Sequence, residues 1–326
     1  MWFPLSLKRK SLGRDEPLLV ISALTAWVLI LSAPATTNSA SNRICTIDDL
    51  ARTVCVSRPV KRVVSFAPSL TETVFALGAG PLLVGRTARC NRPREARAIK
   101  EIGPYLNPDP ERVIASNPDL VLTTAASSRR ELVKRLRNLG IPVFVADSRN
   151  VDDVFKLIRR LGILLSRKSD AERLLQKLQA RRRSVSERLT RVKKPTVLFA
   201  VGTRPLVVAG GQSFLGALIR AAEGTNIAEG NRLAYFKFSL EELIRRDPDV
   251  IIVLNKDCGS KEDCLKEWRR FPDLKASRTN RIYTLEADLL ARPSPSIVEA
   301  LEKLAKILHP EAFRKPDGVA VSRSDR

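Results

Sequence analysis

A segment near residue 111 recurs near residue 241, and this repeat constrains the fold more than any other feature of the sequence. Residues 111–119 read ERVIASNPD and residues 241–249 read EELIRRDPD, at an offset of 130 residues. In each copy a short helical pattern meets a Pro-Asp turn, because proline cannot continue a helix. A run rich in Leu, Val and Ile follows, which is typical of a strand buried on both faces of a parallel sheet. The chain is therefore expected to contain two related α/β lobes.

The rest of the pattern supports this division. Apolar runs alternate with amphipathic helices in both halves, which indicates parallel sheets covered by helices. An apolar stripe between the copies, from Leu174 to Val192, predicts one long helix. Capping boxes are expected at Ser69 with Glu72 and at Ser169 with Glu172. The expected divisions are a targeting segment at 1–35, an N-terminal lobe at 41–166, a linking helix at 167–193, a C-terminal lobe at 194–313 and a flexible tail at 314–326.

The first residues resemble an export signal. Lys8, Arg9, Lys10 and Arg14 precede the uncharged stretch Leu18–Ala33, and Ala33-Pro34-Ala35 offers a cleavage site. We expect a periplasmic or other extracytoplasmic location. If the segment were not cleaved, residues 18–35 would tether the protein to the membrane. A lipid anchor is not expected, since the first cysteine is Cys45.

Export makes disulfide bonds possible. Local spacing predicts Cys45–Cys55 and Cys258–Cys264 bridges and leaves Cys90 free, although sequence alone cannot fix the connectivity.

The net charge of +22 favours anionic partners in general. However, the basic residues are scattered over helices without interleaved aromatic residues, and no zinc-finger or RNA-binding signature accompanies them. We therefore expect a solvated basic surface and no nucleic-acid partner.

Catalytic signatures are missing from the sequence. His309 is the sole histidine, and no nucleophile elbow, phosphate loop or dinucleotide fingerprint occurs in a suitable setting. Neither an enzyme nor a histidine-ligated metal site is expected. Ligands of open α/β sheets bind beyond the carboxyl ends of strands. Those ends are expected at residues 66–69 and 202–205, with the loops 89–91 and 289–292 near the opening.

Several ordered segments resemble the substrate-binding proteins of ABC importers for cobalamin and ferric siderophores, and the cobalamin branch most of all. They are RVVSFAPSLTETVFALGAGPLLVGRT, CNRPREA, NPDPERVIASNPDLVL, FSLEELIRRDPDVII and RPSPSIVEALEKLAKILHPE, and the resemblance covers residues 56 to about 313. It implies a class III periplasmic-binding-protein fold, with two Rossmann-like lobes, central parallel sheets and a single long backbone helix.

The resemblance also implies residue roles. Glu72 and Glu241 match the glutamates that dock onto arginines of the membrane permease. Tyr105 and Tyr235 align with aromatic residues of the cleft, where a flat ring packs well on a corrin face. Leu289 and Ser296 depart from the family pattern, which has an aromatic residue and an arginine there. The candidate ligand-binding residues are Phe66, Pro68, Ser69, Cys90, Tyr105, Gly202, Thr203, Arg204, Tyr235 and Arg292.

The expected function is that an exported monomer captures a cobalamin-like corrinoid between its lobes and delivers it to an ABC importer permease dimer with its ATPase. No cofactor is expected apart from the bound ligand. A ferric siderophore or haem is the alternative ligand, with Arg204 or Arg292 neutralising its carboxylates. Two other classes remain open: an enzyme acting on a corrinoid, which would turn its ligand over, and a membrane-tethered structural protein, whose cleft would stay empty.

Overall fold

The computed structural model describes residues 42–127, 129–254 and 260–314, and the chain from Asn42 onward forms one compact unit. The expected targeting segment and membrane tether, the tail from residue 315 and Cys258 lie outside the described residues.

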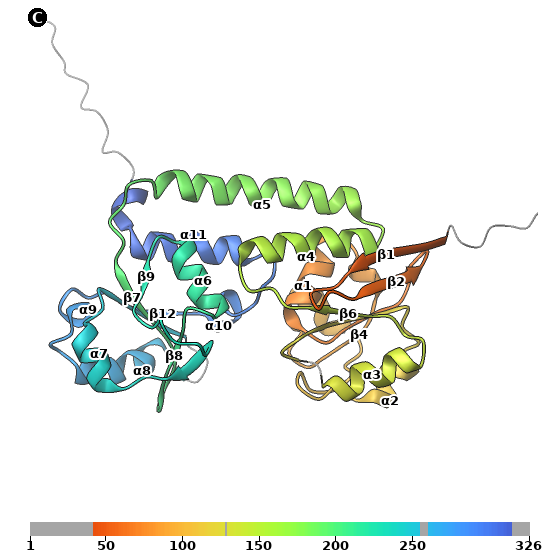
Figure 1. The fold of residues 1–326 in the computed structure, drawn as a ribbon, viewed down its shortest axis with the longest axis horizontal. Helices are drawn as coiled ribbons and strands as arrows, with labels where there is room; N and C mark the ends of the chain where they lie inside the picture. Colours follow the sequence, from red (N-terminus) through yellow and green to blue (C-terminus); the bar gives the residue numbers. More distant parts are fainter. Residues whose placement is uncertain (1–41, 128, 255–259, 315–326) are drawn as a thin grey trace, which may run out of the picture. The chain divides into compact units, whose positions relative to one another are not determined.

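The first sheet has four parallel strands in the order β4-β3-β5-β6 (Figure 1). Helices cover both of its faces, so almost every strand residue is buried. Successive residues alternate between two cores: Leu120 packs with α1 and α4, and Val121 packs with α2 and α3. We call this sheet with α1–α4 the first lobe. Its elements are β3 Val63–Ser65, α1 Pro68–Ala76, β4 Leu83–Arg86, α2 Pro110–Ala115, β5 Leu120–Thr124, α3 Arg130–Asn138, β6 Val143–Ala146 and α4 Val151–Leu164.

The second sheet follows the order β10-β8-β7-β11-β12, with β9 also beside β7. Strands β7, β9, β11 and β12 are parallel, whereas β8 pairs antiparallel with both of its neighbours, β7 and β10. The fold class is as expected, but the second sheet is not purely parallel, because β8 is reversed relative to its neighbours. Only Arg204 and Pro205 separate β7 from β8, and a parallel connection needs about a dozen residues. The strands are β7 Thr196–Thr203, β8 Leu206–Ala209, β9 Thr225–Asn226, β10 Tyr235–Lys237, β11 Val250–Leu254 and β12 Ile282–Leu285.

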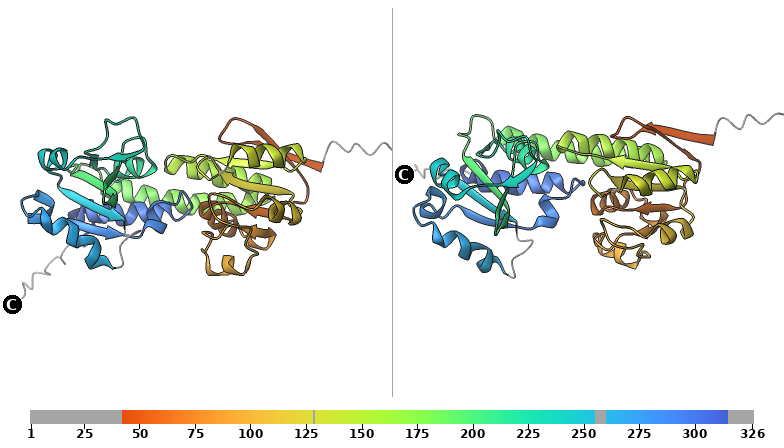
Figure 2. Two further views of the ribbon diagram at one scale, coloured as in Figure 1. Left: turned by 90° about the horizontal axis from the view of Figure 1, so that it is seen from below. Right: turned by 60° about the horizontal axis from the view of Figure 1, so that its bottom comes forward.

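Helices also cover both faces of the second sheet, and together they form the second lobe (Figure 2). One face packs against α6 and α11, and the other against α7, α8 and α9. The helices are α6 Phe214–Ala221, α7 Leu240–Arg246, α8 Lys261–Lys266, α9 Lys275–Arg278, α10 Ala287–Leu290 and α11 Ile297–Leu308.

The long helix α5, Lys168–Arg188, packs against α4 of the first lobe and α11 of the second (Figure 1). Its buried stripe includes Leu175, Leu178 and Val185. The guanidinium of Arg181 pairs with Glu302 of α11 at 2.6 Å, which adds a polar link to the second lobe. The single backbone helix expected between the lobes is therefore present.

The two predicted capping boxes do not form. Helix α1 begins at Pro68 with Ala67 as its N-cap, so Ser69 lies inside the first turn. Proline suits this position because its fixed φ is helical and it lacks the N–H that would go unpaired. Helix α5 begins at Lys168, without a side-chain cap, and the Glu172 carboxylate instead accepts a hydrogen bond from Arg159.

The two copies of the repeated segment adopt the same local structure. Asn117 and Asp247 follow α2 and α7 with positive φ, 40° and 36°. Oδ2 of Asp119 then accepts hydrogen bonds from the two backbone N–H groups before β3, at 2.7 and 2.9 Å. Oδ2 of Asp249 accepts them from the N–H and hydroxyl of Thr196 in β7, at 2.8 and 2.9 Å. Each aspartate fixes the start of a neighbouring central strand.

A hairpin of β1 (Arg43–Ile47) and β2 (Thr53–Ser57) precedes the first lobe. The predicted Cys45–Cys55 disulfide joins its strands. Asp49 attaches it to β6, since its N–H donates to the carbonyl of Val145 at 3.0 Å and its carboxylate accepts from the N–H of Asp147 at 2.8 Å.

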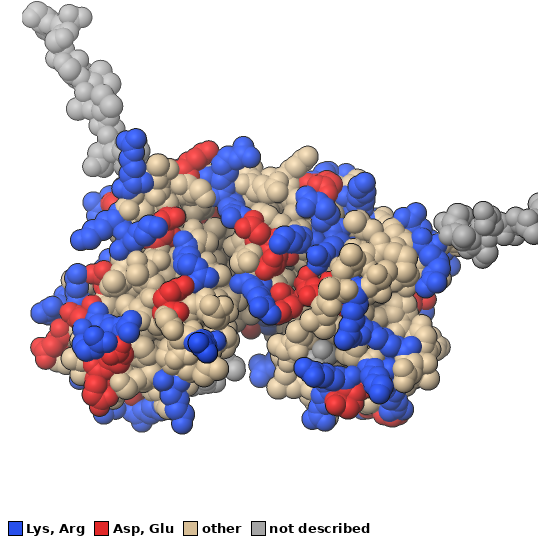
Figure 3. All heavy atoms as spheres, in the orientation of Figure 1, with Lys and Arg blue, Asp and Glu red and all other residues tan. Residues whose placement is uncertain are grey.

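Basic side chains are spread among acidic ones over the face shown in Figure 3. Many form ion pairs, such as Arg160 with Asp49 and Arg182 with Asp152. This distribution agrees with a solvated basic surface.

Candidate functional site

A cavity of about 710 Å³ lies beyond the carboxyl ends of all four strands of the first sheet. This edge is where open α/β sheets bind their ligands. The strand ends and following turns that line the cavity are Pro68 and Ser69 after β3, Ala88 and Arg89 after β4, Thr124, Ala125 and Ala126 at β5, and Ala146, Asp147 and Ser148 at β6.

The second lobe supplies the opposite wall through α10 and the segment that leads to α11, with Ala287, Asp288, Ala291, Arg292 and Pro293. Tyr105 and the exposed Leu106 add apolar surface from the loop before α2. The volume falls within the roughly 300–1,000 Å³ typical of small-molecule pockets. We call it the inter-lobe cavity.

Arg292 is the polar centre of the contact between the lobes. Its side chain is 9% exposed and pairs with Glu72 Oε1 and Asp288 Oδ2, each at 2.7 Å. It also donates to Asn91 Oδ1 at 3.0 Å. Glu72 and Asn91 belong to the first lobe. A buried charge requires such compensation, so the charge of Arg292 is already used and is not free for a ligand carboxylate.

Glu72 does not have the exposure expected of a docking residue. Its side chain is 12% exposed, and its second carboxylate oxygen accepts a hydrogen bond from Ser294 Oγ at 2.7 Å. The carboxylate therefore joins α1 to the segment before α11. Glu241, in contrast, is exposed on α7 and has no ion pair within the described residues.

The structure brings some predicted ligand residues together and buries others. Four of them line the inter-lobe cavity: Pro68, Ser69, Tyr105 and Arg292. Phe66 and Cys90 are 0% exposed, so neither can touch a ligand in the cavity. Phe66 packs in the core of the first lobe, and Cys90 Sγ lies 3.3 Å from Thr87 Oγ1 in the interior. Cys90 forms no disulfide bond, as predicted.

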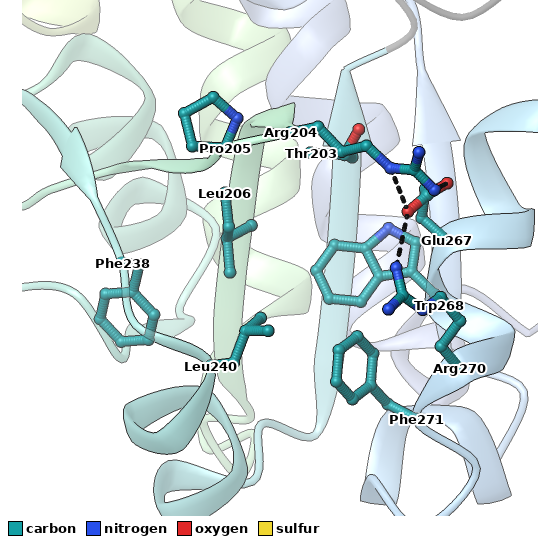
Figure 4. Close-up of a pocket in the computed structure, with 10 residues that line it drawn as sticks. All are labelled: Thr203, Arg204, Pro205, Leu206, Phe238, Leu240, Glu267, Trp268, Arg270 and Phe271. Carbon is teal, nitrogen blue, oxygen red and sulfur yellow. Dashed lines mark hydrogen bonds and ion pairs between the residues drawn. The ribbon is translucent and has the colours of Figure 1, made fainter.

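Thr203 and Arg204 line a second, smaller hollow of about 420 Å³ in the second lobe (Figure 4). Leu206, Phe238 and Leu240 form one wall, and Trp268 and Phe271 form the other. None of the residues that line it also lines the inter-lobe cavity.

Arg204 is engaged within its own lobe. Its Nε donates to the Glu267 carboxylate at 2.9 Å, and Arg270 pairs with the same carboxylate. Arg204 and Pro205 form the turn between the antiparallel strands β7 and β8. This turn is therefore part of a hairpin, and not the start of a connection to a parallel strand. Gly202 and Tyr235 line neither hollow, and Tyr235 is 47% exposed. The sequence predicted that Gly202, Thr203, Arg204 and Tyr235 line the cleft together with residues of the first lobe. None of the four lines the inter-lobe cavity.

Sequence reasoning missed several cavity residues. The carboxyl ends of β5 and β6 contribute Thr124 and Asp147, although the rule that ligands lie at carboxyl ends applies to every parallel strand. In the loop 89–91 the side chain that reaches the cavity is Arg89, rather than Cys90. Asp288 carried no sequence signal, because its role depends on Arg292 beside it.

Two negative findings concern the described residues alone. They contain no group of three His, Cys, Asp or Glu side chains arranged to hold a metal ion. Among their helices, none combines the length and hydropathy that a membrane crossing needs.

Comparisons with known proteins agree with this architecture. A family model described as periplasmic binding protein matches residues 63–289, which spans both sheets. The uncharacterised ABC transporter substrate-binding lipoprotein YvrC of Bacillus subtilis strain 168 is 26% identical over 83% of this chain and 87% of its own. The vitamin B12-binding protein of Vibrio parahaemolyticus serotype O3:K6 is 23% identical over 80% and 94%.

Solved structures extend the similarity to three dimensions. The periplasmic haem-binding protein RhuT from Roseiflexus sp. RS-1, in its apo form, superposes with a TM-score of 0.69 at 28% identity, covering 78% of this chain and 99% of its own. The family consists of transport proteins that bind substrates, and not of enzymes. The chain belongs to the periplasmic binding protein family and is a substrate-binding protein of an ABC transporter.

Proposed function

We propose that the protein binds a cobalamin-like corrinoid in the inter-lobe cavity and delivers it to the permease of an ABC importer. The observation that carries this proposal is the lining of the cavity: a mainly apolar surface with Tyr105, bordered by hydroxyl and carboxylate groups. A large planar ring with an amide-rich edge matches such a lining, because the ring packs on apolar surface and the amides donate to oxygen atoms. The B12-binding relative supports the same choice.

The charges of the cavity favour this ligand over its alternatives. Haem and many ferric siderophores present carboxylates, which call for free cations. Arg292 is compensated by Glu72 and Asp288, so Arg89 is the one lining cation without an ion pair among the described residues. Haem remains the second candidate because Arg89 is exposed at the cavity and the RhuT relative carries that ligand name.

Isothermal titration calorimetry with cobalamin, cobinamide, haem and ferric siderophores tests the proposal. We expect cobalamin or cobinamide to bind most tightly. Tight binding of a siderophore or haem, with weak binding of both corrinoids, would overturn the corrinoid assignment while leaving the transport family intact.

Two variants make the comparison sharper. Tyr105→Ala removes the aromatic surface of the cavity and should weaken corrinoid binding by about 5- to 30-fold, since a buried aromatic contact contributes on the order of 1–2 kcal/mol. Arg89→Ala should leave corrinoid affinity nearly unchanged and should weaken haem binding. A strong loss of corrinoid affinity in Arg89→Ala would show that the ligand is recognised as an anion.

A further inference from the structure

The hairpin of β1 and β2 has one covered face and one open face. Val54 and Val56 point into the core of the molecule and are 5% and 1% exposed. The opposite face is mostly open to solvent, and the disulfide crosses its centre. Directly paired residues share a face, so the register assigns to the open face the pairs Arg43–Ser57, Cys45–Cys55 and Ile47–Thr53.

A groove of about 410 Å³ lies between this hairpin and the connection from α3 to β6. Guanidinium groups from three separate elements line it: Arg43 from β1, Arg52 from the turn before β2, and Arg137 from α3. No acidic side chain is among its lining residues. In Figure 3 basic side chains are present at this end of the molecule, where Figure 1 places the hairpin.

The positive charge of the groove is poorly compensated. Arg43 and Arg52 form no ion pair within the described part of the chain, and Arg137 lies 3.5 Å from Asp48. The other oxygen of Asp48 already accepts backbone hydrogen bonds from Leu50 and Arg52. Burial lowers the pKa of Arg137, and the positive charge of Arg52 lowers it further, against the opposing effect of Asp48. An anion in the groove would relieve this crowding of like charges.

Exposed apolar side chains lie on the same hairpin. Ile47 at the end of β1 is 54% exposed, and Leu50 in the turn is 44% exposed. Surfaces that combine apolar side chains with Arg or Lys are typical of proteins that rest in the interfacial region of a membrane. A soluble anion alone would account for the arginines and not for these two residues.

The position of the hairpin in the chain points to the same occupant. It follows the segment 18–35, which would tether the protein to the membrane if it were not cleaved. Seven residues lead from Ala35 to Asn42, and such a length spans at most about 25 Å. Whenever that segment is held in a bilayer, the hairpin is within this distance of the headgroups.

We propose that the β1–β2 hairpin is a membrane-contact surface, in which Arg43, Arg52 and Arg137 bind the phosphates of anionic lipids while Ile47 and Leu50 enter the interface. This surface lies outside the inter-lobe cavity and does not depend on which ligand the cavity binds.

Co-sedimentation with lipid vesicles tests the proposal on the chain that begins at Asn42, which is a compact unit without the uncharged stretch. We expect binding to phosphatidylglycerol vesicles and little binding to phosphatidylcholine vesicles. Arg43→Ala/Arg52→Ala should weaken the partition about 30-fold, since each basic residue near an anionic surface contributes about 1 kcal/mol.

Lys177→Ala/Arg183→Ala is the matched control, because it removes two exposed charges of α5 that have no ion pair within the described residues. The control should retain most of the binding. Equal losses in both double variants would reduce the binding to the diffuse attraction of a basic protein and would overturn the proposal.

The apolar contribution is measured at raised salt, where electrostatic attraction between exposed groups is screened. At raised salt, Ile47→Ser/Leu50→Ser should bind the vesicles several-fold more weakly than the wild-type chain does. No difference between the two at any salt concentration would remove the apolar part of the contact. Thermal unfolding of each variant checks that the exposed substitutions leave the fold unchanged.

Discussion

Arg292 illustrates how one side chain serves both the fold and the site. It lines the inter-lobe cavity, yet its guanidinium pairs with a glutamate of the other lobe. A ligand that contacts Arg292 or Asp288 therefore acts on a group that also holds the lobes together. Ligand binding in the cavity and the contact between its two walls therefore involve the same side chain.

The role of Glu72 can be separated from that of Glu241 by matched substitutions. Glu72→Gln removes the charge that compensates the nearly buried Arg292, so it should lower the free energy of unfolding by about 1–3 kcal/mol. Glu241→Gln changes an exposed carboxylate without an ion pair in the described chain and should alter the free energy of unfolding by less than about 0.5 kcal/mol. Urea denaturation measures both. Equal stability of the two variants would mean that the ion pair of Glu72 with Arg292 does not stabilise the fold.

Asp249 should make stability depend on pH. Burial raises the pKa of its carboxyl group, but hydrogen bonds from Lys275 and Thr196 outweigh this effect, and the folded-state pKa is lowered. A lowered folded-state pKa stabilises the protein above the unfolded-state value, near 3.9, and this stabilisation is lost as the pH falls through the folded-state pKa.

Asp249→Asn should therefore cost about 1–2 kcal/mol at neutral pH and progressively less below about pH 4. Unfolding curves of both proteins across this range measure the difference. A cost that stays constant down to pH 2 would show that the negative charge of Asp249 does not contribute to its stabilising interactions with Thr196 and Lys275.

Among helices and strands, the close contact of α4 with α5 is set by glycine. A Cβ atom at Gly162 would lie 2.4 Å from Cβ of Ala171, far inside normal contact. Helix propensity alone favours Gly162→Ala by about 1 kcal/mol. We nevertheless expect this variant to be destabilised by about 1–3 kcal/mol, because overpacking forces the helices apart. Thermal unfolding measures the sign directly.

The double variant Gly162→Ala/Ala171→Gly provides the control for this contact. It restores space at the closest atom pair, so the destabilisation should be smaller than the sum of the two single effects. Strict additivity would place the cost of Gly162→Ala elsewhere, for example at the carbonyl of Arg167, 3.2 Å from the added carbon.

Most elements of this fold could be predicted because their signals are local. The Pro-Asp repeat located α2 with β5 and α7 with β11, and apolar runs located β3, β4, β6, β7 and β12, whereas the two-residue parallel strand β9 contains no apolar run and was missed. The antiparallel β8 was missed because its two-residue connection reads like a turn at a strand end. The capping boxes failed because both helices begin one residue before the serine, at Pro68 in α1 and at Lys168 in α5, so neither serine is an N-cap.

The candidate site was less predictable for a physical reason. Whether a polar side chain faces a cavity depends on partners distant in sequence, such as Arg292 for Glu72 and Glu267 for Arg204. The family resemblance suggested Tyr105 and the strand-end rule suggested Ser69, and both residues line the inter-lobe cavity. The strand-end rule could not reveal that Thr203 and Arg204 lie at a different hollow.

The molecule as a whole should change little in shape on binding a ligand. One continuous helix, α5, packs against both lobes, and Arg181 fixes it to α11. Such a helix resists bending more than extended hinge segments do. Small-angle scattering curves with and without ligand should nearly superimpose. A large decrease of the radius of gyration would contradict a rigid connection.

The central claim is that the ligand site is the inter-lobe cavity and that the ligand is a corrinoid. Crystals grown with cobalamin and measured at the cobalt absorption edge test both parts at once, because the anomalous signal locates the metal without a model of the ligand. We predict one strong cobalt peak inside the cavity, between Tyr105 and the segment around Asp288. A peak in the hollow beside Arg204 and Trp268, or no ordered cobalt at saturating cobalamin, would contradict the account.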